Sequence, residues 1–358
     1  MNRFIPFVLT AVGTVAIPAM ANAQVTVFGV VDLAGRMVKN EGVGSVASLA
    51  SGEGLTSRFG VRGSEDLGGG LSAGFHLEST VHGDAGGAGT GSQFWDRRST
   101  VSLSSKSLGE LRLGRDFSPT YSNWGRYDPF GFVGLGRSGT FISGGPTGPI
   151  KSAFGTGPNT LVRSSNGVQY LLPAGSNGLQ GGVFVAPGEG GTAAAGLDKF
   201  FGVRLGYGTT DYEVSAATAT TQNDLTGNEK FKDNVIGGFF KFGGTKVSAA
   251  WRQFKILSAK QTNVLVGVAV PAGPGVVKLS YNQAKLSGSV DGVDIGGNGA
   301  GQLAAGYVYK LSKRTSLYTT ASRVSNDGTS KYTLAGGAPG IVAGGSSSGF
   351  EVGATHSF

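Results

Sequence analysis

The residues that could carry covalent or metal chemistry are few in this chain of 358 residues. It has no cysteine and three histidines, His76, His82 and His356. The pattern HExxH is missing, and the two GxSxG matches, at 70–74 and 345–349, lack the strand–turn–helix context of a nucleophile elbow. Glycine clusters are not followed by a helix, so they do not predict a phosphate loop. We therefore expect no enzyme activity, no catalytic residue, no metal site and no cofactor.

With nucleophiles and metal ligands set aside, arginine is the residue type that could act on a solute, and the arginines are unevenly distributed along the chain. Between positions 96 and 163 there are nine basic and four acidic residues, a net charge of +5 by subtraction. The bases are Arg97, Arg98, Lys106, Arg112, Arg115, Arg126, Arg137, Lys151 and Arg163, and the acids are Asp96, Glu110, Asp116 and Asp128. Closely spaced guanidiniums lower the energy of a nearby anion, so this stretch favours an electrostatic role.

The first 23 residues have the three parts of a secretory signal peptide. Arg3 gives a positive start, an apolar run follows over residues 4–17, and Ala21-Asn22-Ala23 forms a small-residue cleavage site. We expect residues 1–23 to be removed and residues 24–358 to form one exported domain. In an exported chain, a formal charge of +8 favours anionic solutes or lipid headgroups, and we expect no nucleic-acid partner.

The rest of the chain alternates between apolar and polar residues with a period of two, which predicts β-strands. At the C-terminus, Phe350, Val352 and Phe358 share one phase, while Glu351 and Thr355 share the other. Seven pairs of such runs flank short turns and predict hairpins, at residues 57–78, 100–115, 167–187, 200–220, 234–254, 263–283 and 302–324. A first strand from Val25 and a last strand ending at Phe358 bring the expected number to 16.

These strands predict a membrane barrel. Sixteen strands of about 10 residues, with short turns on one side and long connections on the other, are the plan of an outer-membrane barrel. Pairing of the last strand with the first would remove both sheet edges. A soluble sandwich is disfavoured because glycine and charge on the second face favour a water-filled interior. Aromatic residues near strand ends fit interfacial girdles: Tyr207, Phe240, Phe242, Trp251, Tyr307, Tyr309 and Phe358.

Four motifs, GSEDLGGGLSAGFHLE, LGELRLGRD, YKLSKRTSLY and GATHSF, give the chain a family resemblance. Over its whole mature length it resembles general bacterial outer-membrane porins of the beta-proteobacterial type. The resemblance implies an all-β, 16-stranded antiparallel transmembrane β-barrel that assembles as a homotrimer, with an inward-folded third loop. It also implies that outer-membrane lipid and lipopolysaccharide surround the barrel, and that the barrel-assembly machinery reads the terminal Phe358.

The third long connection, residues 117–161, is where we expect the pore constriction. The resemblance implies that wall arginines face loop acids across the pore. Arg58, Arg97 or Arg98, Arg115 and Arg163 match the wall positions, and Asp128 matches the loop acid. The chain departs from this pattern because its loop is poor in acids and carries Arg126 and Arg137, which favours the passage of anions.

Strand phase does not decide, at two of these places, whether the arginine side chain points into the lumen or towards the lipid. Val101 and Leu103 share the phase of Arg97, which would point Arg98 into the lumen unless a bulge reverses the order. Arg115 shares the phase of the apolar Leu111 and Leu113, against its family match.

We therefore expect a passive diffusion channel of the outer membrane that carries small hydrophilic solutes and prefers anions. Two alternatives stay open at this point: a substrate-specific channel with a saturable binding site, and a surface adhesin or antigen on a barrel scaffold.

Overall fold

The computed structural model describes residues 24–142, 148–154, 161–173, 178–188, 199–227 and 229–358. The expected signal peptide, residues 1–23, lies outside this set. Among the described residues, no helix has the length and hydropathy needed to cross a membrane.

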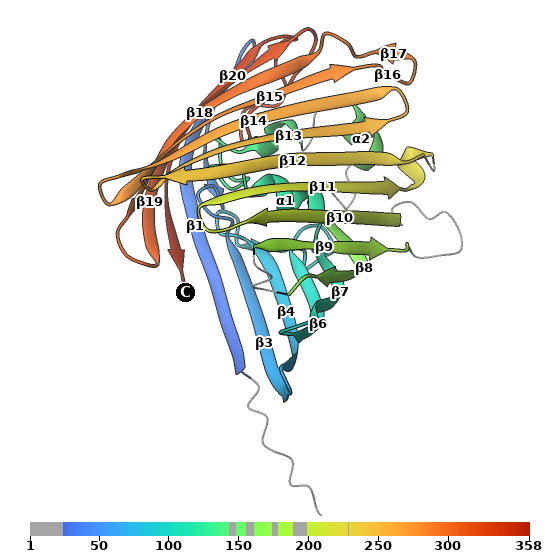
Figure 1. Cartoon of the computed structure of the whole chain (residues 1–358). Coiled ribbons are helices and arrows are strands. Elements are labelled where there is room, and N and C mark those ends of the chain that lie inside the picture. The colour runs from blue at the N-terminus through green and yellow to red at the C-terminus, as the bar shows by residue number, and fades with distance from the viewer. Residues whose placement is uncertain (1–23, 143–147, 155–160, 174–177, 189–198, 228) are drawn as a thin grey trace, which may run out of the picture.

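The strands form a closed antiparallel barrel of sixteen (Figure 1). The strands are β1 (Gln24–Asn40), β2 (Gly44–Ser51), β3 (Arg58–Gly68), β4 (Leu71–His82), β5 (Gly87–Ala88), β6 (Arg98–Ser105), β7 (Gly109–Phe117), β8 (Arg163–Leu171), β9 (Leu179–Ala186), β10 (Lys199–Gly208), β11 (Tyr212–Gln222), β12 (Phe231–Phe242), β13 (Thr245–Ile256), β14 (Ala259–Ala272), β15 (Gly275–Ser287), β16 (Ser289–Val290), β17 (Val293–Asp294), β18 (Gly299–Lys310), β19 (Thr315–Asp327) and β20 (Ser346–Ser357). The helices are α1 (Pro119–Gly125), η1 (Ser138–Phe141), α2 (Pro149–Phe154) and η2 (Asp224–Thr226).

The seam of the barrel lies at β1. One edge of β1 pairs with β20, and its other edge pairs with β2 and then β3, which together act as one barrel strand. The short strands β5, β16 and β17 lie outside the ring. The amide and carbonyl of Gly29 each bond those of Phe358, at 3.1 Å. The predicted pairing of the last strand with the first is therefore confirmed, and it leaves the sheet without an edge.

All seven predicted hairpins are confirmed, as β3–β4, β6–β7, β8–β9, β10–β11, β12–β13, β14–β15 and β18–β19. The long connections on the other side are not uniform. β1 and β2 are joined by residues 41–43, and β13 and β14 by Leu257 and Ser258 alone. Leu257 adopts a φ of 51°, which allows this two-residue turn. The expectation of a long connection was wrong at these two places.

The two faces of the barrel differ as the alternation predicts. On β12, Ile236 and Phe240 point outward and are 52% and 58% exposed, whereas Val235 points inward and is 3% exposed. The terminal Phe358 also lies on the outer face, where its ring covers Gly29 so closely that a Cβ there would be 2.4 Å away. An apolar outer face around a closed barrel matches the hydrocarbon core of a membrane.

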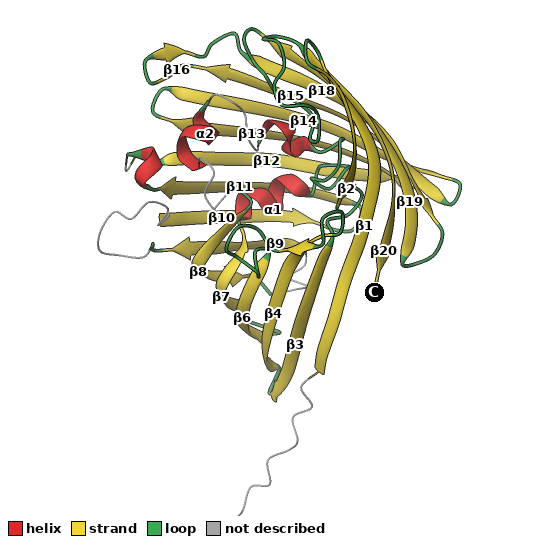
Figure 2. Ribbon diagram, turned by 180° about the vertical axis from the view of Figure 1, so that it is seen from behind, coloured by secondary structure: helices red, strands yellow, loops and turns green. Residues whose placement is uncertain are grey.

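The chain between β7 and β8 is called loop 3, and its described residues, 118–142, 148–154 and 161–162, fold into the barrel (Figure 2). Its first helix, α1, begins with the cap residue Ser118, whose hydroxyl accepts the amide of Tyr121 at 3.2 Å, and with Pro119 at the first helical position. α1 contacts β10, β11 and β12. Trp124 and Phe141 are 0% and 1% exposed, so the inward fold of the third loop that the resemblance implied is confirmed.

A second inward segment, residues 52–57, separates β2 from β3 and is held by Asp32 of β1. The Asp32 carboxylate accepts the amides of Glu53, Gly54 and Leu55 at 2.7–3.1 Å. It also accepts the hydroxyls of Tyr318, at 2.8 Å, and Thr355. Asp32 is fully buried, so these bonds replace the water that a carboxylate needs.

We expect Asp32→Ala to destabilise the barrel strongly. The substitution leaves several buried donors without an acceptor, and each costs about 1–3 kcal/mol, so the free energy of unfolding should fall by at least about 3 kcal/mol. Urea unfolding in lipid vesicles, followed by tryptophan fluorescence, measures this change. The matched control is Asp66→Ala, which removes a turn carboxylate that accepts one amide, from Gly68. Equal losses in the two variants would contradict the role given to Asp32.

Candidate pore constriction

Loop 3 rests on four inward-facing glycines, one on each of strands β12, β14, β18 and β20. A Cβ atom built at three of them would lie 2.3–2.9 Å from a loop 3 side chain, closer than real Cβ contacts, and at the fourth, Gly306, it would lie 3.0 Å away, tighter than most real contacts. These glycines, called the glycine track below, are Gly237, Gly267, Gly306 and Gly349, and they meet Tyr127, Pro129, Phe130 and Leu135 in that order. The sequence analysis assigned inner glycines to a water-filled interior; at these positions they accommodate the loop instead.

Polar side chains of the same wall fix the loop backbone. The amide groups of Asn282 and Gln302 donate to the carbonyls of Ser138 and Leu135, at 3.2 and 2.8 Å. The Gln261 amide donates to the carbonyl of Phe141 at 2.5 Å. All three side chains are buried, so loop 3 has a defined position rather than a loose one.

The carboxylate of Asp128, the expected loop acid, accepts hydrogen bonds from groups of loop 3 itself. Its carboxylate accepts the amides of Phe130, Phe132 and Ser138 at 2.8–3.1 Å, and the Ser138 hydroxyl at 2.6 Å. It is 6% exposed. A carboxylate with four internal donors organises the turn, so its position within loop 3 is fixed.

Arg126, at the end of α1, is paired with the wall. Its Nε donates to Glu213 of β11 at 2.6 Å, and Arg204 of β10 donates to the same carboxylate at 2.9 Å. The neighbouring Tyr127 also donates to Glu213, and burial raises the pKa of its phenol to about 12. Replacing Arg126 with Glu would place two carboxylates together, so Arg126 is a poor probe of ion preference.

Arg137 lies on the side of loop 3 near the barrel seam. It is within electrostatic range of Glu53, Arg36 and Glu351. Burial lowers the pKa of Arg137, but a guanidinium starts so high that it keeps its charge at neutral pH. Glu53 pairs with Arg36 at 2.9 Å, and Glu351 accepts the amide of Leu135 at 3.1 Å. Both carboxylates near Arg137 therefore also anchor other groups.

The wall away from the glycine track carries the expected arginines. Arg97, before β6, lies between Arg58 of β3 and Arg163 of β8, and Arg58 and Arg97 both lie near Glu78 of β4. Arg97 pairs with Glu78, whereas Arg163 donates to the carbonyl of Arg97 at 2.8 Å. The structure thus brings together three of the residues predicted for this wall.

Aromatic rings join this wall to loop 3. The guanidinium of Arg163 lies 4.5 Å from the ring centre of Phe117. Phe117 stacks on Tyr121 at 5.1 Å, and Tyr121 meets the edge of Phe132 at 5.0 Å. Arg163 therefore has a fixed position beside the loop.

The structure also places the two arginines whose phase was ambiguous. The chain bends at Arg97, before β6 begins, and this bend lets both Arg97 and Arg98 bond groups on the lumen side: Arg97 to Glu78 and Arg98 to Thr100 at 3.0 Å. In β7, a register shift follows Gly114. Beyond it Arg115 is 9% exposed and donates to the Asp96 carbonyl and the Ser165 hydroxyl, so its guanidinium is held within the wall.

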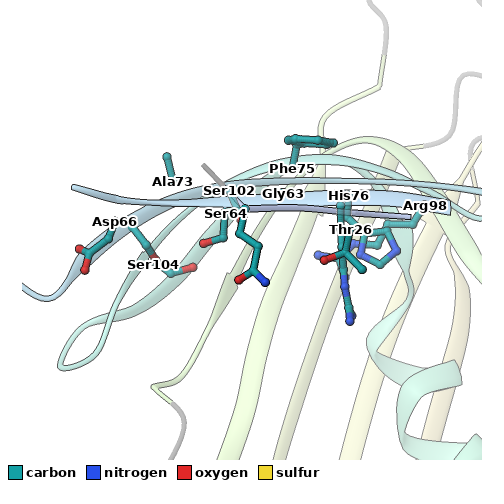
Figure 3. Close-up of a pocket in the computed structure, with 14 residues that line it drawn as sticks. Thr26, Gly63, Ser64, Asp66, Ala73, Phe75, His76, Arg98, Ser102 and Ser104 are labelled. Carbon is teal, nitrogen blue, oxygen red and sulfur yellow. The ribbon is translucent and has the colours of Figure 1, made fainter. Parts of the chain in front are cut away.

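Below the constriction, towards the short turns, a hollow of about 610 Å³ follows the inner wall of β1, β3, β4 and β6. Figure 3 shows Arg98 and His76 beside Thr26, with the hydroxyls of Ser64 and Ser102 nearby. Phe75, on the same strand as His76, points to the opposite face (Figure 3). The lumen wall here is hydroxylic and basic.

The sequence analysis missed Arg62 and His76 as lumen residues. Arg62 is two residues after Arg58 and so shares its phase, a signal that was available. The guanidinium of Arg62 lies 5.2 Å from the ring centre of Phe28, and His76 bonds Glu78 at 3.2 Å. The anchoring role of Glu213 had no such signal, because it depends on loop 3.

We expect Gly267→Val to narrow the pore. The new side chain would collide with Pro129, whose Cγ lies 2.3 Å from the Cβ position, and would push loop 3 from the wall into the lumen. Overpacking of this kind costs about 1–3 kcal/mol, and single-channel conductance should fall.

Planar-bilayer recording measures this conductance. The matched control is Gly35→Val on β1, where a Cβ meets nothing within 4 Å. A normal conductance for Gly267→Val would mean that the glycine track does not set the position of the loop.

Comparison with known proteins agrees with this geometry. Residues 8–329 match the profile of a family described as Gram-negative porin. The chain is 35% identical to outer membrane porin protein 32 of Delftia acidovorans, over 95% of each sequence. It is 26% identical to major outer membrane protein P.IB of Neisseria meningitidis serogroup B, over 93% of this chain and 98% of the relative.

Solved structures give the same result. An anion-selective porin from Comamonas acidovorans superposes with a TM-score of 0.79 at 32% identity, over 94% of this chain and 100% of that one. OmpT of Vibrio cholerae shares the fold, with a TM-score of 0.65 at 14% identity over 94% and 98% of the two chains. The chain belongs to the Gram-negative porin family and is a passive channel of the outer membrane.

Proposed function

We propose that this porin is a general diffusion channel that prefers anions. The observation that carries the proposal is an imbalance of charge across the constriction. Among the described residues, Arg58 and Arg163 of the wall form no ion pair with a carboxylate, and the one acid of the loop segment that faces them, Asp128, is buried and bonded within the loop.

The wall arginines differ in how far their charge is neutralised. Arg97 is paired with Glu78, and Arg112 with Glu110 and Asp116 at 2.6 and 2.9 Å. By contrast, Arg58 donates to the carbonyl of Thr56 at 3.4 Å, and Arg163 to the carbonyl of Arg97 at 2.8 Å. A carbonyl carries no net charge, so Arg58 and Arg163 keep a positive field directed at the solute path.

The comparison with solved structures supports the same preference. The Comamonas acidovorans structure is described as an anion-selective porin, and it is a relative at 32% identity over nearly the whole chain. Transport needs no energy source, because solutes move down their gradient through water.

We also propose that three barrels assemble and that Phe358 forms part of the signal that the barrel-assembly machinery reads. The family resemblance supports the trimer. For Phe358 the support is its place at the seam: it is 51% exposed on the outer face, and its backbone bonds Gly29 of β1.

We expect the double variant Arg58→Gln and Arg163→Gln to lose anion preference. Both charges act on the same narrow path, within a Debye length of about 10 Å at 0.1 M salt, so their removal should move the reversal potential in a KCl gradient towards the potassium value. The matched control is Arg323→Gln, which removes an exposed arginine on the outer face of β19.

The control should keep the wild-type reversal potential, and the trimer should keep its stability in both variants. An unchanged reversal potential in the double variant would refute the assignment of Arg58 and Arg163.

A further inference from the structure

A row of lysines crosses the outer face of the barrel near the ends of β12, β13 and β14 that are remote from the short turns. Lys232 lies directly opposite Lys255, and Lys255 lies directly opposite Lys260. All three point outward and are either exposed or half-buried. We propose that this lysine row (Lys232, Lys255 and Lys260) binds the phosphate groups of a phosphorylated glycolipid in the outer leaflet.

The lysine row by itself destabilises the sheet. Like charges directly opposite each other on neighbouring strands destabilise a sheet. Among the described residues, no carboxylate forms an ion pair with Lys232, Lys255 or Lys260. Lysines in such an arrangement fit an external anion that sits between them, and lysine is a common phosphate ligand.

The surface beside the row is hollowed. A depression of about 410 Å³ is lined by Lys232 and Lys255 together with Lys230, Gln222, Glu229 and Leu257. Of these described lining residues, Glu229 is the single acid, against three lysines. The depression therefore keeps a net positive charge, with room for a headgroup.

The residues below the row show where the hydrocarbon ends. The next outward positions are polar and bond one another: the Thr218 hydroxyl donates to Asn234 at 2.8 Å, and the Gln253 amide donates to Thr262 at 3.4 Å. One step further along β13, Trp251 is outward and 37% exposed. Amides facing hydrocarbon would be costly, so this polar layer lies at headgroup level and Trp251 lies at the interface.

The height of the row agrees with that level. Phe240, one of the aromatic residues at the short-turn end, follows Lys232 by eight positions on β12. That distance is about 26 Å along the strand, or roughly 20 Å along the barrel axis after tilt, comparable with an apolar band of about 25 Å. The long lysine stems extend further towards the headgroups.

A lipid fits better than a soluble phosphate as the occupant. The row faces outward from the barrel, away from the solute path, and β12 to β15 lie side by side with this end turned from the short turns (Figure 1). In a Gram-negative porin that end faces the outer leaflet. The two-residue turn between β13 and β14 keeps Lys255 and Lys260 at this level.

The test compares binding of bis-phosphorylated lipid A to folded wild-type porin and to the triple variant K232Q/K255Q/K260Q, by native mass spectrometry in detergent. We expect binding to weaken on the order of 100-fold, because each surface lysine contributes about a factor of five. K232R/K255R/K260R should retain most of the binding. Heat-modifiable migration and single-channel conductance report whether each variant is folded.

The matched control is K106Q/K310Q/K313Q, which removes the same charge from turns at the opposite end. An equal loss in this control would overturn the proposal. So would dephosphorylated lipid A binding as tightly as the bis-phosphorylated form, or inorganic phosphate binding as tightly as the lipid. If the triple variant fails to fold, Lys255→Gln alone removes the lysine that faces both neighbours, and unchanged lipid A binding would overturn the proposal.

Discussion

The contact between loop 3 and the glycine track determines which part of the barrel interior can be filled with water. A barrel of sixteen strands is wide enough to hold an open channel, and its inner wall would accept a loop in many places. The absence of a Cβ at Gly237, Gly267, Gly306 and Gly349 lets Tyr127, Pro129, Phe130 and Leu135 approach the backbone of one half of the wall. Loop 3 therefore covers that half, and we propose that the path for solutes follows the other half, from β3 to β8.

The charge of the path follows from this arrangement. Acidic side chains inside the barrel are used as anchors: Asp32 holds residues 52–57, Asp128 holds loop 3, and Glu213 holds Arg126 and Arg204. Each of them accepts several internal donors, so its carboxylate is fixed in an anchoring position. On the open half, Arg58 and Arg163 form no ion pair with a carboxylate among the described residues. The anion preference that we propose thus depends as much on where the carboxylates are used as on the number of arginines.

The sequence predicted much of this fold because its signals are local. Alternation with period two and short turns identified all seven hairpins, and the last strand paired with the first as expected. The burial of Trp124 and Phe141 in loop 3 was also predictable, since large aromatic side chains are costly to expose.

The sequence could not predict features that depend on a break in the alternation or on distant contacts. The bend at Arg97 and the register shift after Gly114 change side-chain direction. A glycine within a strand is compatible with a bulge, but many strands of this chain contain glycine, so Gly114 alone does not locate the shift. Asp128 was assigned to the pore because it is the loop's acid, but its four donors lie up to ten residues away in a loop with no periodic pattern. The glycine track spans four strands, so its members have no common sequence signal.

The most direct measurement is the accessibility of single cysteines from the lumen, in a chain that has no cysteine of its own. One variant, Ser102→Cys, places the cysteine on the open half of the wall. The other, Ala250→Cys, places it under loop 3, where Ala250 is 5% exposed. We predict that a sulfonate-bearing methanethiosulfonate reagent reduces the current through the Ser102→Cys channel and leaves the Ala250→Cys channel unchanged. Equal modification of both would contradict the docking of loop 3 on the glycine track and the position of the solute path that depends on it.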